Sequence, residues 1–114
     1  AGIIFIGPYP ETVIKMGDKT AAKAVARECN VPVVPGTDSA VVDKDAAYQW
    51  CQENGLPVMM KASMGGGGRG MRVVRKMEEV KEAFTRCSSE ALTAFGDGSM
   101  FIERLIERPR HIEV

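Results

Sequence analysis

Four consecutive glycines, Gly65 to Gly68, separate two segments that have the composition of β-strands. The apolar segment "LPVMMKAS" (56–63) precedes them, and "MRVVR" (71–75) follows them. Glycine inside a strand is destabilising by roughly 0.5–1 kcal/mol relative to alanine, so a run of glycines is expected only in a loop. The sequence therefore predicts a β-hairpin whose two strands are joined by a long loop at the tip.

The glycine loop has the composition of a phosphate-binding lid. Consecutive backbone N–H groups without side chains can surround an anion, and Arg69 adds a positive charge. The loop is not a Walker A loop, because no Gly-Lys-Ser/Thr sequence closes it. Gly65, Gly67 and Gly70 match G-x-G-x-x-G, but a strand follows them where a dinucleotide fingerprint requires a helix. A glycine-rich loop between two strands covers ATP in protein kinases, and we predict the same use here; a merely flexible turn is the alternative.

The bulk composition excludes several classes of protein. Lysine plus arginine and aspartate plus glutamate each number 15, so no net charge attracts the chain to nucleic acid or to a membrane. The longest apolar run, residues 3–6, is too short to span a bilayer, and its flanks do not resemble a signal peptide. An RGG-like nucleic-acid module is disfavoured by the neutral charge and the scarcity of aromatic residues.

The three cysteines, Cys29, Cys51 and Cys87, have no metal-like spacing, and each lies on the apolar face of a predicted helix. We therefore predict buried, reduced thiols. Reduced thiols are typical of a reducing compartment, so we expect an intracellular protein.

The segment before residue 31 is predicted to be a strand followed by two helices. "GIIFIGP" (2–8) has the composition of a short buried strand. "PETVIKM" fits a helix that Gly17 ends. Asp18 is the predicted N-cap of a second helix, which ends near Asn30.

From residue 31 onward the predicted element order is β-α-β-β-α-β. Asp43 or Asp45 opens the first of these helices, and the second spans 78–95. The strands are expected in 31–37, 56–63, 71–75 and 99–106, with one more beginning in "RHIEV" (110–114). Two helices on one face of a small, largely antiparallel sheet make a two-layer α+β unit. Both chain ends fall inside apolar or strand-like segments, so we expect a fragment of a larger domain.

Four polar residues are assigned first from their residue types and neighbours alone. Lys61 ends an apolar strand beside the glycine loop, which favours an anionic partner such as phosphate. Lys19 follows a predicted N-cap, and we expect it to be a solvated lysine on the surface. Glu103 alternates with apolar neighbours, which is typical of the solvated face of a strand, and His111 is expected on the surface.

Several strings of the sequence together resemble the biotin carboxylase family of the ATP-grasp superfamily. They are "FIGP", "MGDK", "VPVVPGT", "GGGGRGMRVVR", "AFGDGS" and "PRHIEV", and they cover essentially the entire chain. ATP-grasp relatives without biotin chemistry, such as carbamoyl phosphate synthetase, share the scheme but not these strings. Within the family the strings are most similar to the domain of pyruvate carboxylases. The acetyl-, propionyl- and methylcrotonyl-CoA carboxylases, and another ATP-grasp ligase, are the alternatives.

The resemblance implies a domain organisation and a reaction. Residues 1–30 would be the end of the N-terminal subdomain and a helical linker, 31–105 the ATP-grasp lid subdomain, and 106–114 the start of the C-terminal subdomain. Such a domain uses ATP, Mg²⁺ (or Mn²⁺) and bicarbonate to carboxylate biotin on a carrier domain. The implied partners are the biotin carboxyl carrier domain and a carboxyltransferase domain, in a homo-oligomeric parent of the mitochondrial matrix or bacterial cytoplasm. Neither nucleic acid nor a membrane is an implied partner.

The resemblance also implies which residues bind ATP, and it changes the expectations for Lys19 and Glu103. The implied residues are Lys19, Lys61, Gly65, Gly66, Gly67, Gly68, Arg69, Met71, Glu103, Arg104, Ile106 and His111. The two lysines would reach the phosphates and the glycines with Arg69 would close over them. Met71 would pack near the nucleotide, Glu103, Arg104 and Ile106 would read the adenine edge, and His111 would lie near the phosphates.

One feature of the family is expected outside this chain. The magnesium-binding glutamates, the base that activates bicarbonate and the arginine near biotin would all follow Val114. The resemblance therefore implies no catalytic or metal-binding residue within the 114 residues, and we expect them to be inactive alone. Arg104 stands where lysine is commoner, which matters little if the backbone makes the adenine contact.

Overall fold

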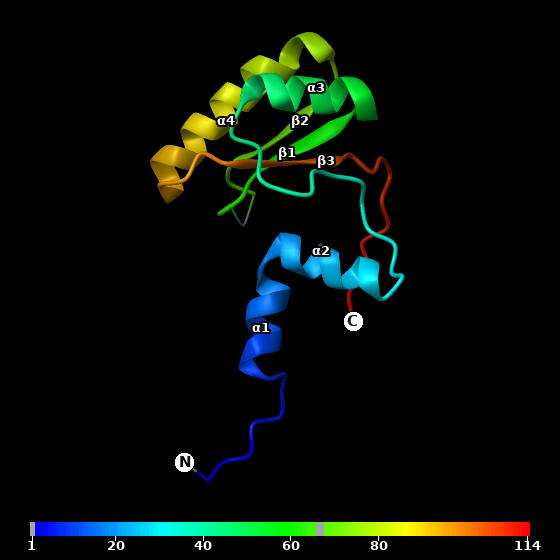
Figure 1. Cartoon of the computed structure of the whole chain (residues 1–114), viewed down its shortest axis with the longest axis vertical. Helices are drawn as coiled ribbons and strands as arrows, with labels where there is room; N and C mark the ends of the chain where they lie inside the picture. Colours follow the sequence, from blue (N-terminus) through cyan, green and yellow to red (C-terminus); the bar gives the residue numbers. More distant parts are fainter. Residues whose placement is uncertain (1, 66–67) are drawn as a thin grey trace. The chain divides into compact units, whose positions relative to one another are not determined.

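The structure is a computed structural model that describes residues 2–65 and 68–114. The chain divides into two compact units, Ala1–Val33 and Val34–Val114 (Figure 1). The predicted lid residues Gly66 and Gly67 lie outside the described residues.

The first unit contains helices α1 (Pro10–Gly17) and α2 (Lys19–Glu28). Proline is favoured at the start of a helix because its missing N–H would have no partner there. The Asp18 carboxylate accepts a hydrogen bond from the Ala21 N–H at 3.0 Å, so the predicted N-cap is confirmed. Asn30 adopts a left-handed φ of 57° just beyond α2, as expected where a helix ends.

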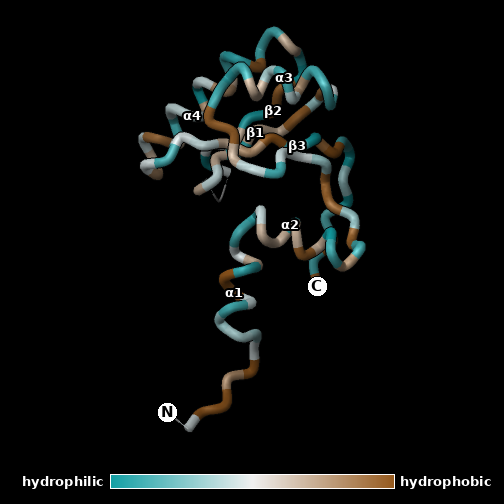
Figure 2. The backbone as a smooth tube through the Cα atoms, viewed as in Figure 1, coloured by the Kyte–Doolittle hydropathy of each residue, from teal (hydrophilic) through white to brown (hydrophobic). Residues whose placement is uncertain are grey.

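Two predictions for the first unit are wrong. Residues 2–8 form no strand, although they make an apolar segment near the N-terminus (Figure 2). The side chains of Ile3 and Phe5 are 89% and 79% exposed. A strand requires a neighbour that takes its backbone hydrogen bonds, and no strand of residues 2–65 or 68–114 pairs with this segment. Cys29, at the C-cap of α2, is exposed, because α2 itself buries none of its residues.

Within the described residues, the second unit contains a three-stranded sheet in the order β2-β1-β3. The strands are β1 (Val58–Ala62), β2 (Met71–Val74) and β3 (Met100–Arg104), and β1 pairs antiparallel with both neighbours. The hairpin register runs from Val58 opposite Val74 to Lys61 opposite Met71. The predicted strand–glycine loop–strand hairpin is therefore confirmed.

The outer edge of β3 is covered by an extended segment and not by a full strand. Gly36 and Val41 make isolated bridges to β3, and the Val41 N–H donates to the Met100 carbonyl at 2.7 Å. Proline removes backbone donors, so the segment predicted as a strand at 31–37 pairs only in part. The strand predicted to begin in 110–114 is not formed, because no strand of the described residues pairs with this segment.

Helices α3 (Lys44–Asn54) and α4 (Val80–Phe95) cover one face of the sheet, which is the predicted two-layer arrangement (Figure 1). The Asp43 carboxylate accepts from the Asp45 N–H at 3.2 Å, so Asp43 is the N-cap of α3. A single 3₁₀ turn, η1 (Met77–Glu79), leads into α4, which therefore begins two residues later than predicted.

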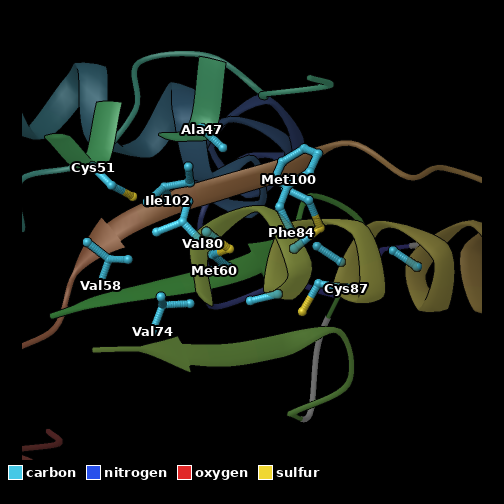
Figure 3. Close-up of a cluster of buried hydrophobic side chains, with 13 residues drawn as sticks. Ala47, Cys51, Val58, Met60, Val74, Val80, Phe84, Cys87, Met100 and Ile102 are labelled. Atoms are coloured by element: carbon cyan, nitrogen blue, oxygen red, sulfur yellow. The ribbon is translucent and has the colours of Figure 1, made fainter. Parts of the chain in front are cut away.

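The hydrophobic core lies between the sheet and these helices (Figure 3). Alternate strand residues point into it, and α4 contributes an apolar stripe with helical spacing. The labelled residues that meet there are Ala47, Cys51, Val58, Met60, Val74, Val80, Phe84, Cys87, Met100 and Ile102. Cys51 and Cys87 are buried, as predicted. Burial raises the pKa of the Cys51 thiol to about 11, and it raises that of Cys87 as well, so both thiols stay protonated.

The core predicts the response to truncation of Ile102, which is fully buried at the centre of β3. Ile102→Ala should lower the free energy of unfolding by about 2–5 kcal/mol, because it removes apolar contacts and leaves a cavity. Leu92→Ala on the outer face of α4 is the matched control, since Leu92 is 59% exposed. Urea unfolding of both variants checks this; equal losses would show that β3 is not packed against the helices.

Candidate functional site

The face of the sheet opposite the helices carries the candidate site, which we call the open face. Strand residues alternate between faces, so the residues between the buried ones point to this side. The register places Met59 between Val73 and Glu103, and Lys61 between Met71 and Phe101. The open face is therefore a mainly apolar surface that contains one lysine and one glutamate: Met59, Lys61, Met71, Val73, Phe101 and Glu103.

Lys61 and Glu103 form an ion pair on the open face. The Lys61 Nζ lies 2.6 Å from the Glu103 Oε2, and the two side chains are 28% and 15% exposed. The attraction between two charges is stronger when they are partly removed from water than in full solvent. Removal of one partner then leaves the other charge partly buried and unpaired. The structure thus brings together two of the predicted site residues, which are 42 positions apart in the sequence.

The glycine loop begins at the end of β1 and folds back against Ala62. The Ala62 N–H donates to the Gly70 carbonyl at 2.7 Å, and the Gly65 N–H donates to the Ala62 carbonyl at 3.0 Å. A Cβ at Gly70 would lie 2.8 Å from the Ala62 Cβ, and one at Gly65 would lie 2.8 Å from the Arg69 carbonyl oxygen. Glycine at positions 65 and 70 is therefore required by the path of the backbone, whatever the loop binds.

Three polar residues that the sequence did not single out fix the start of the loop. The Ser63 N–H donates to the Ser99 carbonyl at 2.9 Å, and the two serine hydroxyls are hydrogen-bonded to each other. The Ser99 N–H in turn donates to Asp97 Oδ1 at 2.9 Å and holds the pKa of the Asp97 carboxyl below its usual value. The residue that follows Ala62 is thereby tied to the turn between α4 and β3.

The remaining predicted residues of the second unit lie in different surroundings. Arg69 is exposed in the loop, and Met71 is 40% exposed on the open face. The Arg104 guanidinium donates to the Asn54 carbonyl at 3.1 Å, so this side chain caps the C-terminus of α3. Ile106 and His111 follow β3 with exposed side chains.

Lys19 is the first residue of α2 and belongs to the other unit. Within residues 2–65 and 68–114, no three or more His, Cys, Asp or Glu side chains lie close enough together to hold a metal ion. The described helices include none with the length and apolar character needed to cross a membrane.

The loop geometry predicts that Gly68 and Gly70 respond differently to alanine. Both have positive φ, 85° and 64°, which strains a residue with a Cβ by about 1–2 kcal/mol. Only the Gly70 Cβ would also clash with Ala62, whereas a Cβ at Gly68 meets open space. Urea unfolding should therefore show a larger loss for Gly70→Ala than for Gly68→Ala, by about 1 kcal/mol or more. Equal losses would mean that the loop does not pack on Ala62.

Comparison with known proteins identifies relatives of this arrangement. Residues 18–114 match the family described as carbamoyl-phosphate synthase L chain, ATP binding domain. The human mitochondrial pyruvate carboxylase is 55% identical over 114 residues, which are 100% of this chain and 10% of that protein. The chain thus spans about a tenth of the length of the curated relatives it matches.

Solved structures that resemble this chain are also biotin carboxylases. The biotin carboxylase of Campylobacter jejuni superimposes with a TM-score of 0.82 at 47% identity, over 91% of this chain and 23% of that one. The biotin carboxylase domain of Hydrogenobacter thermophilus 2-oxoglutarate carboxylase superimposes with a TM-score of 0.80 at 43% identity, over 93% of this chain and 23% of that one. The predicted fold class, an α+β fragment of an ATP-grasp domain, is confirmed. The chain belongs to the family of carbamoyl-phosphate synthase L chain ATP-binding domains, and within it is similar to biotin carboxylases and pyruvate carboxylases.

Proposed function

We propose that this chain is the ATP-binding lid segment of a biotin carboxylase domain, and that the whole protein is a pyruvate carboxylase. The observation that carries the proposal is a half-buried lysine, Lys61, which is paired with Glu103 on a mainly apolar sheet face beside a glycine-rich loop. The 55% identity to the human pyruvate carboxylase supports the choice of acceptor. On this proposal, residues 31–105 form the lid subdomain. Residues 1–30 are the end of the N-terminal subdomain and a helical linker, and residues 106–114 are the start of the C-terminal subdomain.

The residues of the open face fit an adenine nucleotide. Met59, Met71 and Phe101 offer the flat apolar surface on which a purine ring can stack. Lys61 lies at the end of β1 where the glycine loop begins, so a nucleotide on this face would have its phosphates near the loop. The Hydrogenobacter domain was solved with MgADP and bicarbonate, which supports ATP, magnesium and bicarbonate as the ligands of this family.

Each of the proposed ATP-binding residues then has a physical role. The Lys61 ammonium donates to phosphate oxygens, and Arg69 adds charge as the loop excludes water. Since the Gly65 N–H is already bonded to the Ala62 carbonyl, the N–H groups of the glycines that follow it would surround the phosphates. Lys19 contributes a second ammonium from α2, and His111 lies toward the phosphates. Since the Arg104 side chain is engaged with Asn54, its contact to adenine would come from the backbone, together with Glu103 and Ile106.

The bound groups supply the reaction chemistry: MgATP provides the phosphoryl group that activates bicarbonate, and biotin accepts the carboxyl group. The magnesium ligands are proposed to follow Val114, as the resemblance to biotin carboxylases implies. The base that activates bicarbonate and the arginine near biotin are proposed there too, and the 114 residues alone would be inactive. A carrier domain and a carboxyltransferase domain would be the partners, in a homo-oligomer of the mitochondrial matrix or bacterial cytoplasm.

The phosphate role of Lys61 is tested in the full-length protein with Lys61→Ala. Loss of a charged hydrogen bond should raise the Kd for a non-hydrolysable MgATP analogue by about 10- to 100-fold, measured by calorimetry. Lys76→Ala is the control, because Lys76 is an exposed lysine just before η1. An unchanged affinity in the Lys61 variant would contradict the phosphate role.

Bicarbonate-dependent ATP hydrolysis by the full-length protein distinguishes the proposed reaction from its alternatives. Biotin carboxylase activity predicts that free biotin accelerates hydrolysis, since biotin is the final acceptor of the carboxyl group. Hydrolysis that is indifferent to biotin would instead assign the protein to another ATP-grasp ligase. Carboxylation of pyruvate, compared with acetyl-, propionyl- and methylcrotonyl-CoA, then identifies the acyl acceptor.

A further inference from the structure

We infer that Glu103 is a positioning residue that acts on the nucleotide through Lys61, and not chiefly by contact with the adenine ring. The inference rests on the proposed function. Its structural basis is the 2.6 Å ion pair between the Lys61 ammonium and the Glu103 carboxylate on the open face.

The sheet register determines the direction in which Glu103 holds the lysine. Lys61 lies opposite Phe101, and Glu103 lies opposite Met59 on the same pair of strands. Glu103 is therefore displaced from Lys61 by two residues, about 7 Å, away from the glycine loop. The carboxylate thus engages the ammonium from the side remote from the loop, so it does not occupy the loop side, where phosphate would bind.

The chemistry of the ammonium allows both contacts at once. An ammonium group has three donors, so a lysine that gives one to a carboxylate retains two for phosphate oxygens. A lysine side chain also has a flexible four-carbon stem, and it loses much rotamer freedom when it is fixed. Because the ion pair already orders Lys61, less of that entropic cost would fall on nucleotide binding.

The surroundings of the pair favour an ordered lysine over a mobile one. The side chain of Glu103 is only 15% exposed, and the neighbours of both residues across the strands are the apolar Met59, Met71 and Phe101. Without the carboxylate, a half-buried ammonium would turn toward solvent, since burial of an unpaired charge is unfavourable. The ion pair therefore keeps Lys61 on the face to which we assign the nucleotide.

The test measures the Kd for a non-hydrolysable MgATP analogue in the full-length protein. Glu103→Ala should weaken binding about tenfold, whereas Glu103→Gln should have at most about a threefold effect, because its amide oxygen still accepts from Lys61. In a Lys61→Ala background, Glu103→Ala should cause no further loss, because the residue acts through the lysine. The preference for ATP analogues over GTP analogues should stay unchanged.

Glu90→Ala is the matched control, because it removes the carboxylate of a different ion pair, between Arg72 of β2 and Glu90 of α4 at 2.9 Å, outside the site. It should leave the Kd unchanged, and thermal melting verifies that each variant is folded. Glu103→Gln covers the case in which Glu103→Ala does not fold.

The outcomes separate this inference from the proposed function. Additive losses for Glu103→Ala and Lys61→Ala, or a lost preference for adenine, would overturn the positioning role and show that Glu103 touches the nucleotide itself. Tighter binding by Glu103→Ala would also overturn it, because the carboxylate would then compete with phosphate. If Lys61→Ala alone leaves the affinity unchanged, the proposed function fails together with the inference.

Discussion

The pairing of β1 on both of its edges fixes the face that carries the candidate site. Val58, Met60 and Ala62 point into the core, so Met59 and Lys61 must point to the open face. A shift of one residue in register would exchange the two sets and turn the Lys61 ammonium toward the apolar side chains of the core. The register that fills the core is therefore the register that presents the lysine.

Ala62 connects this core to the glycine loop. Its side chain is buried, and Gly70 approaches it too closely to carry a Cβ, while a Cβ at Gly65 would clash with the Arg69 carbonyl oxygen. The hydrogen bonds of Ser63 to Ser99 hold the next residue in place. The two ends of the loop thus belong to the folded unit, and their glycines serve the fold. At Gly68, by contrast, a Cβ would meet open space, so only the positive φ of 85° favours glycine there.

Local patterns were sufficient to predict the hairpin, the caps of α2 and α3, and the apolar stripe of α4, because all of these depend on residues close together in sequence. The strands predicted at 2–8 and 110–114 failed, since an apolar run becomes a strand only when a partner pairs with it. Alternation placed Glu103 on the correct face of β3. It could not show that Lys61 would neutralise it, because that contact depends on the alignment of strands 42 residues apart.

The neutralisation of Lys61 by Glu103 weakens the long-range attraction between the open face and a polyanion such as a triphosphate. The open face contains an ammonium and a carboxylate at 2.6 Å, so its net charge is close to zero before any ligand binds. A neutral, mainly apolar surface suits a purine ring but attracts a triphosphate only weakly at long range. On the proposed function, the attraction of the phosphates would then come from groups that the ion pair does not cancel, namely the loop N–H groups and Arg69. Lys61 would determine where the nucleotide lies, while the loop would supply most of the attraction for its phosphates.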